Sequence, residues 1–165
     1  MALTRINNQA LTNVTSAGLP SGTVLQVKQA SSNSKIILAS ESFVDCLELS
    51  ITPFSTNSKF LINTFVTAYV QTANGAAIRL MRDSSEIYDP NNMNSSNQHY
   101  YAYQGSSTMY PTLNISYLDT PSTTSVITYK VQMCRYGANT GNVWFNGGGN
   151  SQCSTSSFNV MEIAG

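Results

Sequence analysis

The sequence predicts an all-β fold, an antiparallel jelly-roll β-sandwich that follows an extended N-terminal arm. Apolar residues alternate with a period of two along several segments, turn residues separate these segments, and no stretch carries a helical stripe. We assign residues 1–20 to the arm and residues 21–165 to the sandwich.

The arm places sparse apolar side chains among threonine, asparagine and glutamine. Threonine and asparagine are weak helix formers, and the Gly18-Leu19-Pro20 sequence ends any helix. We therefore expect an extended segment that docks on another protein, with a frayed terminus as the alternative. The residues expected to dock are Leu3, Ile6, Leu11, Val14 and Leu19.

The clearest strand runs from Phe60 to Val70. Its even positions are nearly all apolar or β-branched, while its odd positions include Leu61, Phe65 and Tyr69. Because this second face is also too apolar for open water, we expect it to meet another subunit or a covering loop.

Seven further segments alternate in the same way or are continuously apolar. The segment at the C-terminal end is apolar on both faces, as in the central strand of a sandwich. The Asn74-Gly75 pair lies between two apolar runs and predicts a hairpin turn. The other predicted strands are Thr23–Val27, Cys46–Ile51, Ala76–Arg82, Pro111–Leu118, Ser125–Tyr136, Asn142–Phe145 and Ser157–Ile163.

The charge composition excludes several classes of partner. Only 10% of the residues are charged, and the formal net charge is zero. Such a chain lacks the basic surface that binds nucleic acid or an anionic membrane. No apolar run is long enough to span a membrane, and the first residues do not read as a signal peptide. A neutral surface favours packing against identical copies or a larger assembly.

Residues for catalysis or metal binding are sparse. The only histidine is His99, and no carboxylate lies near it in the sequence. Asp83, Glu86 and Asp89 form the densest acidic group, which we interpret as a turn, with a glycosidase site or a calcium site as alternatives. We expect no enzymatic activity, no metal and no cofactor.

The cysteines are three in number and widely spaced: Cys46, Cys134 and Cys153. We expect them to be buried reduced thiols that act as small hydrophobic side chains. A Cys134–Cys153 disulfide is the alternative.

An aromatic cluster is the candidate ligand site. Tyrosines gather in one segment beside asparagine and glutamine, and a tryptophan follows near a glycine-rich loop. Three interpretations stay open, namely packing in the β core, a subunit interface and the binding of a sugar. The candidate residues are His99, Tyr100, Tyr101, Tyr103, Tyr110 and Trp144.

Three segments carry a resemblance to a known kind of protein. They are MALTRINNQALTNVTSAGLPSGTVLQV at residues 1–27, ISYLDTPSTTSVITYKV at residues 115–131, and FNVMEIA at residues 158–164. Together they resemble small virion proteins of marine and cyanobacterial bacteriophages. The resemblance implies a structural or tail-fibre protein with a jelly-roll body similar to that of tumour necrosis factor, and a homotrimer. It carries no catalytic motif.

The resemblance leads to two expected functions within a virion that is assembled in the host cytoplasm. The first is a trimeric short tail fibre or fibre tip, held to other virion proteins by its arm and contacting a host surface glycan. The alternative is a trimeric capsid cement, decoration or adaptor protein, since the sequence contains no repetitive shaft. The residues expected at the trimer interface are Leu61, Phe65, Tyr69 and Tyr129.

Overall fold

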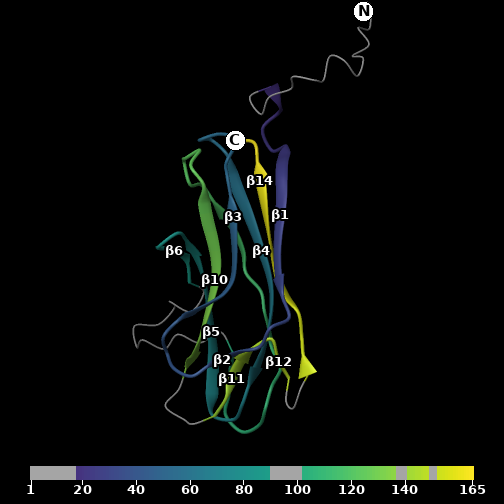
Figure 1. Cartoon of the computed structure of the whole chain (residues 1–165), viewed down its shortest axis with the longest axis vertical. Helices are drawn as coiled ribbons and strands as arrows, with labels where there is room; N and C mark the ends of the chain where they lie inside the picture. Colours follow the sequence, from purple (N-terminus) through teal and green to yellow (C-terminus); the bar gives the residue numbers. More distant parts are fainter. Residues whose placement is uncertain (1–17, 90–101, 137–140, 149–151) are drawn as a thin grey trace, which may run out of the picture.

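Two antiparallel sheets pack face to face in the computed structural model, which describes residues 18–89, 102–136, 141–148 and 152–165 (Figure 1). The chain passes from one sheet to the other several times, as in a jelly roll. The prediction of an all-β antiparallel sandwich is therefore confirmed.

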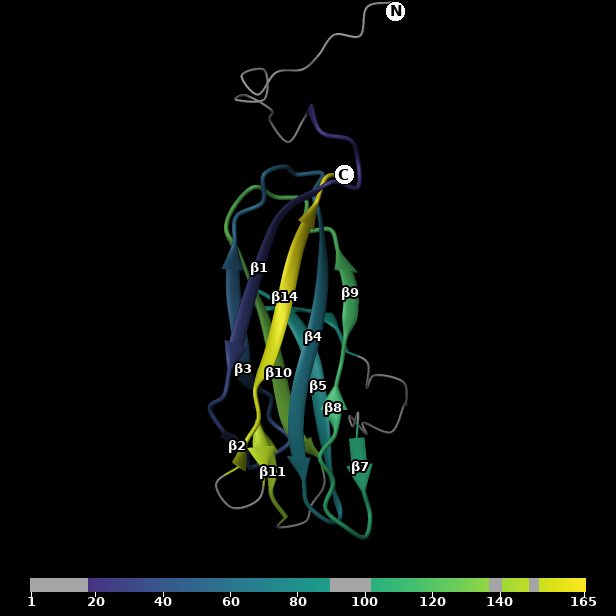
Figure 2. The same ribbon diagram turned by 90° about the vertical axis from the view of Figure 1, so that its right-hand side faces the viewer.

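The first sheet is organised around its longest strand, β4 (Lys59–Val70). The first half of β4 lies between β14 (Ser156–Ile163) and β9 (Ser116–Asp119), and β1 (Val24–Ser32) lies outside β14. Along the second half, β11 (Val143–Phe145) and β8 (Thr112–Leu113) take over as neighbours, with β2 (Ile36–Leu38) outside β11 (Figure 2). As predicted, the last strand is central.

The second sheet has the order β3 (Val44–Ile51), β10 (Ile127–Tyr136), β5 (Asn74–Arg82) and β6 (Ser85–Tyr88). Strand β7 (Ala102–Gln104) also pairs with β5. A small hairpin of β12 (Gly147–Gly148) and β13 (Gln152–Cys153) completes the described strands.

Two local predictions need correction. The predicted strand Pro111–Leu118 is divided into β8 and β9, because the Thr64 hydroxyl accepts a hydrogen bond from the Ile115 amide, 2.8 Å away, at the point of division. The hairpin predicted at Asn74-Gly75 is wrong, because β4 and β5 lie in different sheets. Both residues belong to β5, and the bend comes at Ala73, where φ is +60°.

The core contains an ionic contact that joins the sheets. Asp119 on β9 accepts two hydrogen bonds from Arg82 on β5, at 2.7 and 2.9 Å, and one from the hydroxyl of Tyr129 on β10, at 2.7 Å. Tyr129 is only 1% exposed, and its ring packs against Phe60 with 5.8 Å between centroids. Burial, and then Asp119, raise the pKa of the Tyr129 phenol. Because this residue fills the core of its own chain, the prediction that it faces another subunit is wrong.

Side chains close the seam between the two sheets along β1. Gln26 donates a hydrogen bond to the carbonyl of Thr52, and Lys28 donates one to the carbonyl of Ser50, each at 2.9 Å. The carboxylate of Glu162, which is fully buried, accepts hydrogen bonds from the Gln26 amide and from the backbone amide of Phe54. Side chains of β1 therefore occupy backbone carbonyls at the edge of β3 and in the residues that follow it.

A second polar cluster anchors the opposite end of the first sheet. Asn146 is fully buried and has a φ of +54°. Its amide nitrogen donates to the carbonyls of Ser32 and Ser34, at 2.7 and 3.2 Å, and its oxygen accepts from the hydroxyls of Ser156 and Thr67. One side chain therefore holds the ends of β1, β4 and β14 together.

Within the described ranges, no helix is long and apolar enough to cross a lipid bilayer.

Candidate functional site

Strands β1, β14, β4 and β9 lie side by side in the first sheet (Figure 2), and an apolar row crosses their outward side. Strand register aligns its members, because Val27 pairs with Met161, Met161 with Leu61, and Leu61 with Leu118. Val27 is 59% exposed and Leu118 is 50% exposed. We call the outward side of these four strands the outer face.

A polar row of uncharged side chains lies next to the apolar row. It is formed by Gln29, Asn159, Asn63 and Ser116, again aligned by register. The next aligned positions are Ser157 and Phe65, and Phe65 is 52% exposed. Among the strand positions that point outward here, Lys59 at the start of β4 is the one charged side chain within the described part of the chain.

The opposite side of the sandwich has a different character. Lys130 pairs with Asp45 and Arg79 pairs with Glu86, each at 2.7 Å. The pKa of Asp45 is lowered, chiefly by its hydrogen bond to Lys130. The two outer surfaces of the sandwich therefore differ, because one presents ion pairs to solvent and the other presents apolar and amide groups.

An aromatic row crosses the lower half of the first sheet. Trp144 stacks on Tyr69, with 4.5 Å between centroids and 17° between planes, and Tyr110 meets Tyr69 edge to face at 5.4 Å. The ammonium of Lys35 lies 4.2 Å from the centre of the Trp144 ring. Since β11 lies between β4 and β2, Lys35 and Tyr69 approach Trp144 from opposite sides.

This arrangement leaves Tyr110, but not Trp144, with a ring surface that a ligand could reach. The ring faces of Trp144 are covered by Tyr69 and Lys35, so they are not open to a sugar. Tyr110 is 62% exposed and keeps a free surface for a ligand. Tyr69, predicted at the trimer interface, is only 9% exposed because its aromatic neighbours cover it.

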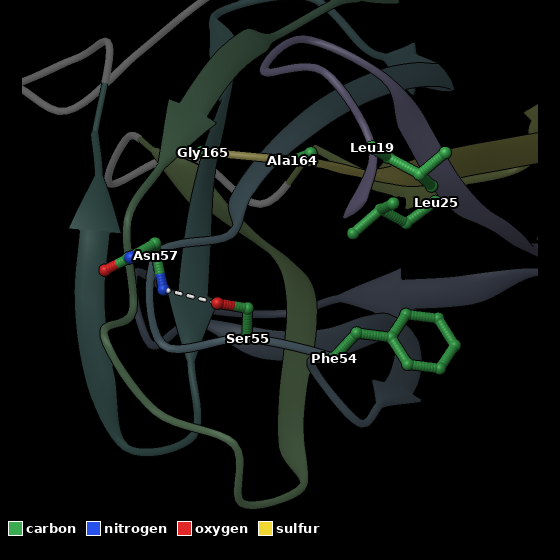
Figure 3. A pocket seen from close by; sticks show the side chains of 7 residues that line it. All are labelled: Leu19, Leu25, Phe54, Ser55, Asn57, Ala164 and Gly165. Atoms are coloured by element: carbon green, nitrogen blue, oxygen red, sulfur yellow. Dashed lines mark hydrogen bonds between the residues drawn. The ribbon is translucent and has the colours of Figure 1, made fainter. Parts of the chain in front are cut away.

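A hollow of about 370 Å³ lies at the end of the sandwich where the described chain begins (Figure 3). Leu19 and Leu25 lie side by side on one part of its wall, and Phe54, which is 60% exposed, borders it below. Elsewhere in the wall, the backbone amide of Asn57 donates a hydrogen bond to the Ser55 hydroxyl at 3.1 Å. Leu19, predicted as an arm residue, is half-buried and lines this hollow.

The other predicted site residues lie in several parts of the chain. Leu61 and Phe65, predicted at a trimer interface, lie on the outer face, and the interface itself stays a prediction. Tyr103 lies in β7, where its backbone pairs with that of Gly75. The predictions for Leu3, Ile6, Leu11, Val14, His99, Tyr100 and Tyr101 lie outside the described residues.

The acidic group does not form a cluster of ligands. Glu86 pairs with Arg79, and Asp83 accepts a hydrogen bond from the backbone amide of Thr128 at 2.9 Å. Within the described ranges, no three histidine, cysteine, aspartate or glutamate side chains come together as a metal site would require.

Cys46 and Cys134 are buried free thiols. Burial raises the pKa of each to about 12. Cys134 is therefore not disulfide-bonded to Cys153, and the expectation of buried reduced thiols holds for these two residues.

Val27, Met161 and Leu118 were not singled out from the sequence. Each is an apolar residue on the outward side of its strand, which the alternation along the strand could have indicated. Only the register between the strands places them beside Leu61.

Comparison with models of protein families and with curated proteins finds no match to this chain.

Proposed function

We propose that this chain is a structural component of a bacteriophage particle, without enzymatic activity, that assembles as a homotrimer through the outer face. In this proposal it serves as a short tail fibre or fibre tip within the virion. Its N-terminal arm holds it to other virion proteins. The phage assignment rests on the sequence resemblance, and the mode of assembly rests on the outer face.

The observation that carries the proposal is the difference between the two outer surfaces of the sandwich. The outer face presents mainly apolar and amide side chains, whereas the opposite surface presents ion pairs. Val27, Phe65 and Leu118 are each at least half exposed. Burying the rest of each such side chain would contribute about 1 kcal/mol. Among the described strand positions that point outward on this face, Lys59 is the one charge that a charged partner could pair with, so a neutral and apolar surface fits better. A second copy of the chain offers such a surface.

A glycan contact is a secondary part of the proposal. Tyr110 supplies an exposed aromatic ring next to Tyr69, and an aromatic ring can stack on the apolar face of a sugar. A cement, decoration or adaptor role is the alternative, since a single sandwich with one assembly face suits a lattice on a capsid equally well.

The oligomeric state tests the proposal first. Light scattering on the full chain should give three times the chain mass of 17.9 kDa at micromolar concentration. Phe65→Lys should reduce the mass to that of one chain. Val44→Lys is the matched control, because Val44 is also exposed, at 40%, but lies on the second sheet, and this variant should keep the wild-type mass. A wild-type chain that stays single at all concentrations would refute assembly.

The position in the particle separates the two roles. Antibodies against the chain, labelled with gold, should mark the tail or its fibres on intact virions in the electron microscope. A regular array over the head would instead establish the cement role, and an absence of label on virions with accessible tails and heads would reject both.

A further inference from the structure

We infer that Asn146 is a modification site gated by folding: its side-chain amide is lost as ammonia from the unfolded chain, is protected in the folded chain, and leaves a product that the fold does not accept. The inference concerns the chain itself and does not depend on the proposed assembly. It starts from Asn146-Gly147, one of two Asn-Gly pairs in the sequence.

The packing around this pair demands both of its residues. A Cβ atom at position 147 would lie 2.6 Å from the Cβ of Trp144 and 3.0 Å from that of Tyr69, so only glycine fits there. At position 146, the φ of +54° favours asparagine over most other residues. The hydrogen bonds of its side chain also need an amide, which donates at its nitrogen and accepts at its oxygen. The fold therefore requires a chemically labile pair at this point.

The lability comes from the backbone nitrogen of Gly147. In alkaline solution this nitrogen attacks the side-chain carbon Cγ of Asn146. The bond from the nitrogen to Cγ forms, the bond from Cγ to Nδ2 breaks, and ammonia leaves with the proton of the Gly147 nitrogen. Water then opens the cyclic imide on either side, which gives aspartate or isoaspartate and releases one proton. Glycine permits this attack because no side chain shields its nitrogen and its backbone rotates freely.

The folded chain opposes the reaction in two ways. Asn146 is 0% exposed, so water is excluded from its amide. The amide nitrogen, which is the leaving group, donates to the carbonyls of Ser32 and Ser34 at 2.7 and 3.2 Å. Ammonia can leave only after these hydrogen bonds break, so the reaction has to wait for local or global unfolding.

The product does not fit the site that held the amide. A carboxylate has no hydrogen to donate, so the carbonyls of Ser32 and Ser34 would face its oxygens without a donor between them. Burying its charge adds a further cost. Isoaspartate also lengthens the backbone just before Gly147, where even a Cβ atom has no room. Modification would therefore mark a chain that has unfolded and hinder its return to the fold.

Peptide mapping of the full chain tests the gate. The chain is incubated in mildly alkaline buffer with and without urea, and mass spectrometry follows the conversion of amide to acid at each asparagine. Modification of Asn146 should be at least about tenfold slower without urea, because the reactive state must first open. Asn33, which is exposed and precedes Ser34, is the internal control and should react at similar rates in both buffers. Equal rates at Asn146 in the two buffers would overturn the inference.

Two variants test the chemistry and its consequence. In urea, where the fold has no influence, Gly147→Ala should slow the modification of Asn146 several-fold, and an unchanged rate would overturn the attack by the Gly147 nitrogen. Asn146→Asp reproduces one product and should denature at a lower urea concentration than Asn146→Gly, which removes the same side chain without adding a charge. An Asn146→Asp chain that is as stable as Asn146→Gly, or more stable, would overturn the barrier to refolding.

Discussion

Replacing Asn146 tests the polar cluster that holds the ends of three strands. Asn146→Gly removes the hydrogen bonds to the carbonyls of Ser32 and Ser34 and the acceptor for the hydroxyls of Ser156 and Thr67. At about 1 kcal/mol for each well-formed bond, the variant should lose about 3 kcal/mol of unfolding free energy. The two hydroxyls keep a contact with each other at 3.3 Å, which limits the loss.

Asn146→Ala separates the hydrogen bonds from the backbone conformation. The φ of +54° is in the left-handed region, where alanine costs about 1–2 kcal/mol and glycine costs little. Glycine also makes the unfolded chain more flexible, which offsets about 0.4–1 kcal/mol of that difference. We therefore expect the alanine variant to be less stable than the glycine variant by about 0.5–1 kcal/mol.

Urea denaturation at one fixed protein concentration measures both losses, since assembly would make stability depend on concentration. Trp144 is the only tryptophan and stacks on Tyr69 nearby, so its fluorescence reports local unfolding while circular dichroism reports the strands. The denaturant slopes of the variants must equal that of the wild type. If both variants stay within about 0.5 kcal/mol of the wild type, the hydrogen-bond reasoning fails. If alanine is the more stable of the two, the conformational reasoning fails.

The remaining predictions concern the buried polar groups of the core. Asp119→Asn should lower the unfolding free energy by about 2–3 kcal/mol, less than for a fully buried pair because the Arg82 side chain is 27% exposed, and equal denaturation midpoints would contradict this. The raised pKa of Tyr129 means that its phenol stays protonated in the folded chain, so its contribution to stability is complete below the unfolded pKa of about 10 and is lost as the pH rises above it. A spectrophotometric titration should therefore show one tyrosine that ionises only on unfolding, and Tyr129→Phe should remove it. Cys46 and Cys134, with pKa values of about 12, should resist iodoacetamide at pH 8 until denaturant is added, and peptide mapping by mass spectrometry would reveal any labelling of the folded chain.

The long segments rich in apolar and β-branched residues could be predicted as strands because their signal is local. Phe60–Val70 and Ser157–Ile163 were found almost to the residue, as β4 and β14. The short strand β2 was missed, since three residues from Ile36 are too few to establish a period. The Asn74-Gly75 prediction failed because a turn signal does not say whether the next strand pairs with the previous one or crosses to the other sheet.

The candidate site was predictable only in part. The outward placement of Leu61 and Phe65 could be predicted, because the period of two along β4 assigns them to the face opposite Phe60 and Ile62. Tyr129 could not be placed correctly, because its hydroxyl partner Asp119 comes from a strand in the opposite sheet. The row that joins Leu61 to Val27 depends on register between distant segments, which a local pattern does not contain.

The seam along β1 has a consequence for how copies of this chain can meet. An edge strand with free carbonyls invites a strand from another molecule to extend the sheet, which leads to uncontrolled polymers. Gln26 and Lys28 occupy carbonyls of β3 and the loop after it with their own side chains, so a foreign strand would first have to displace them. These side-chain hydrogen bonds therefore steer the chain away from endless growth along this edge.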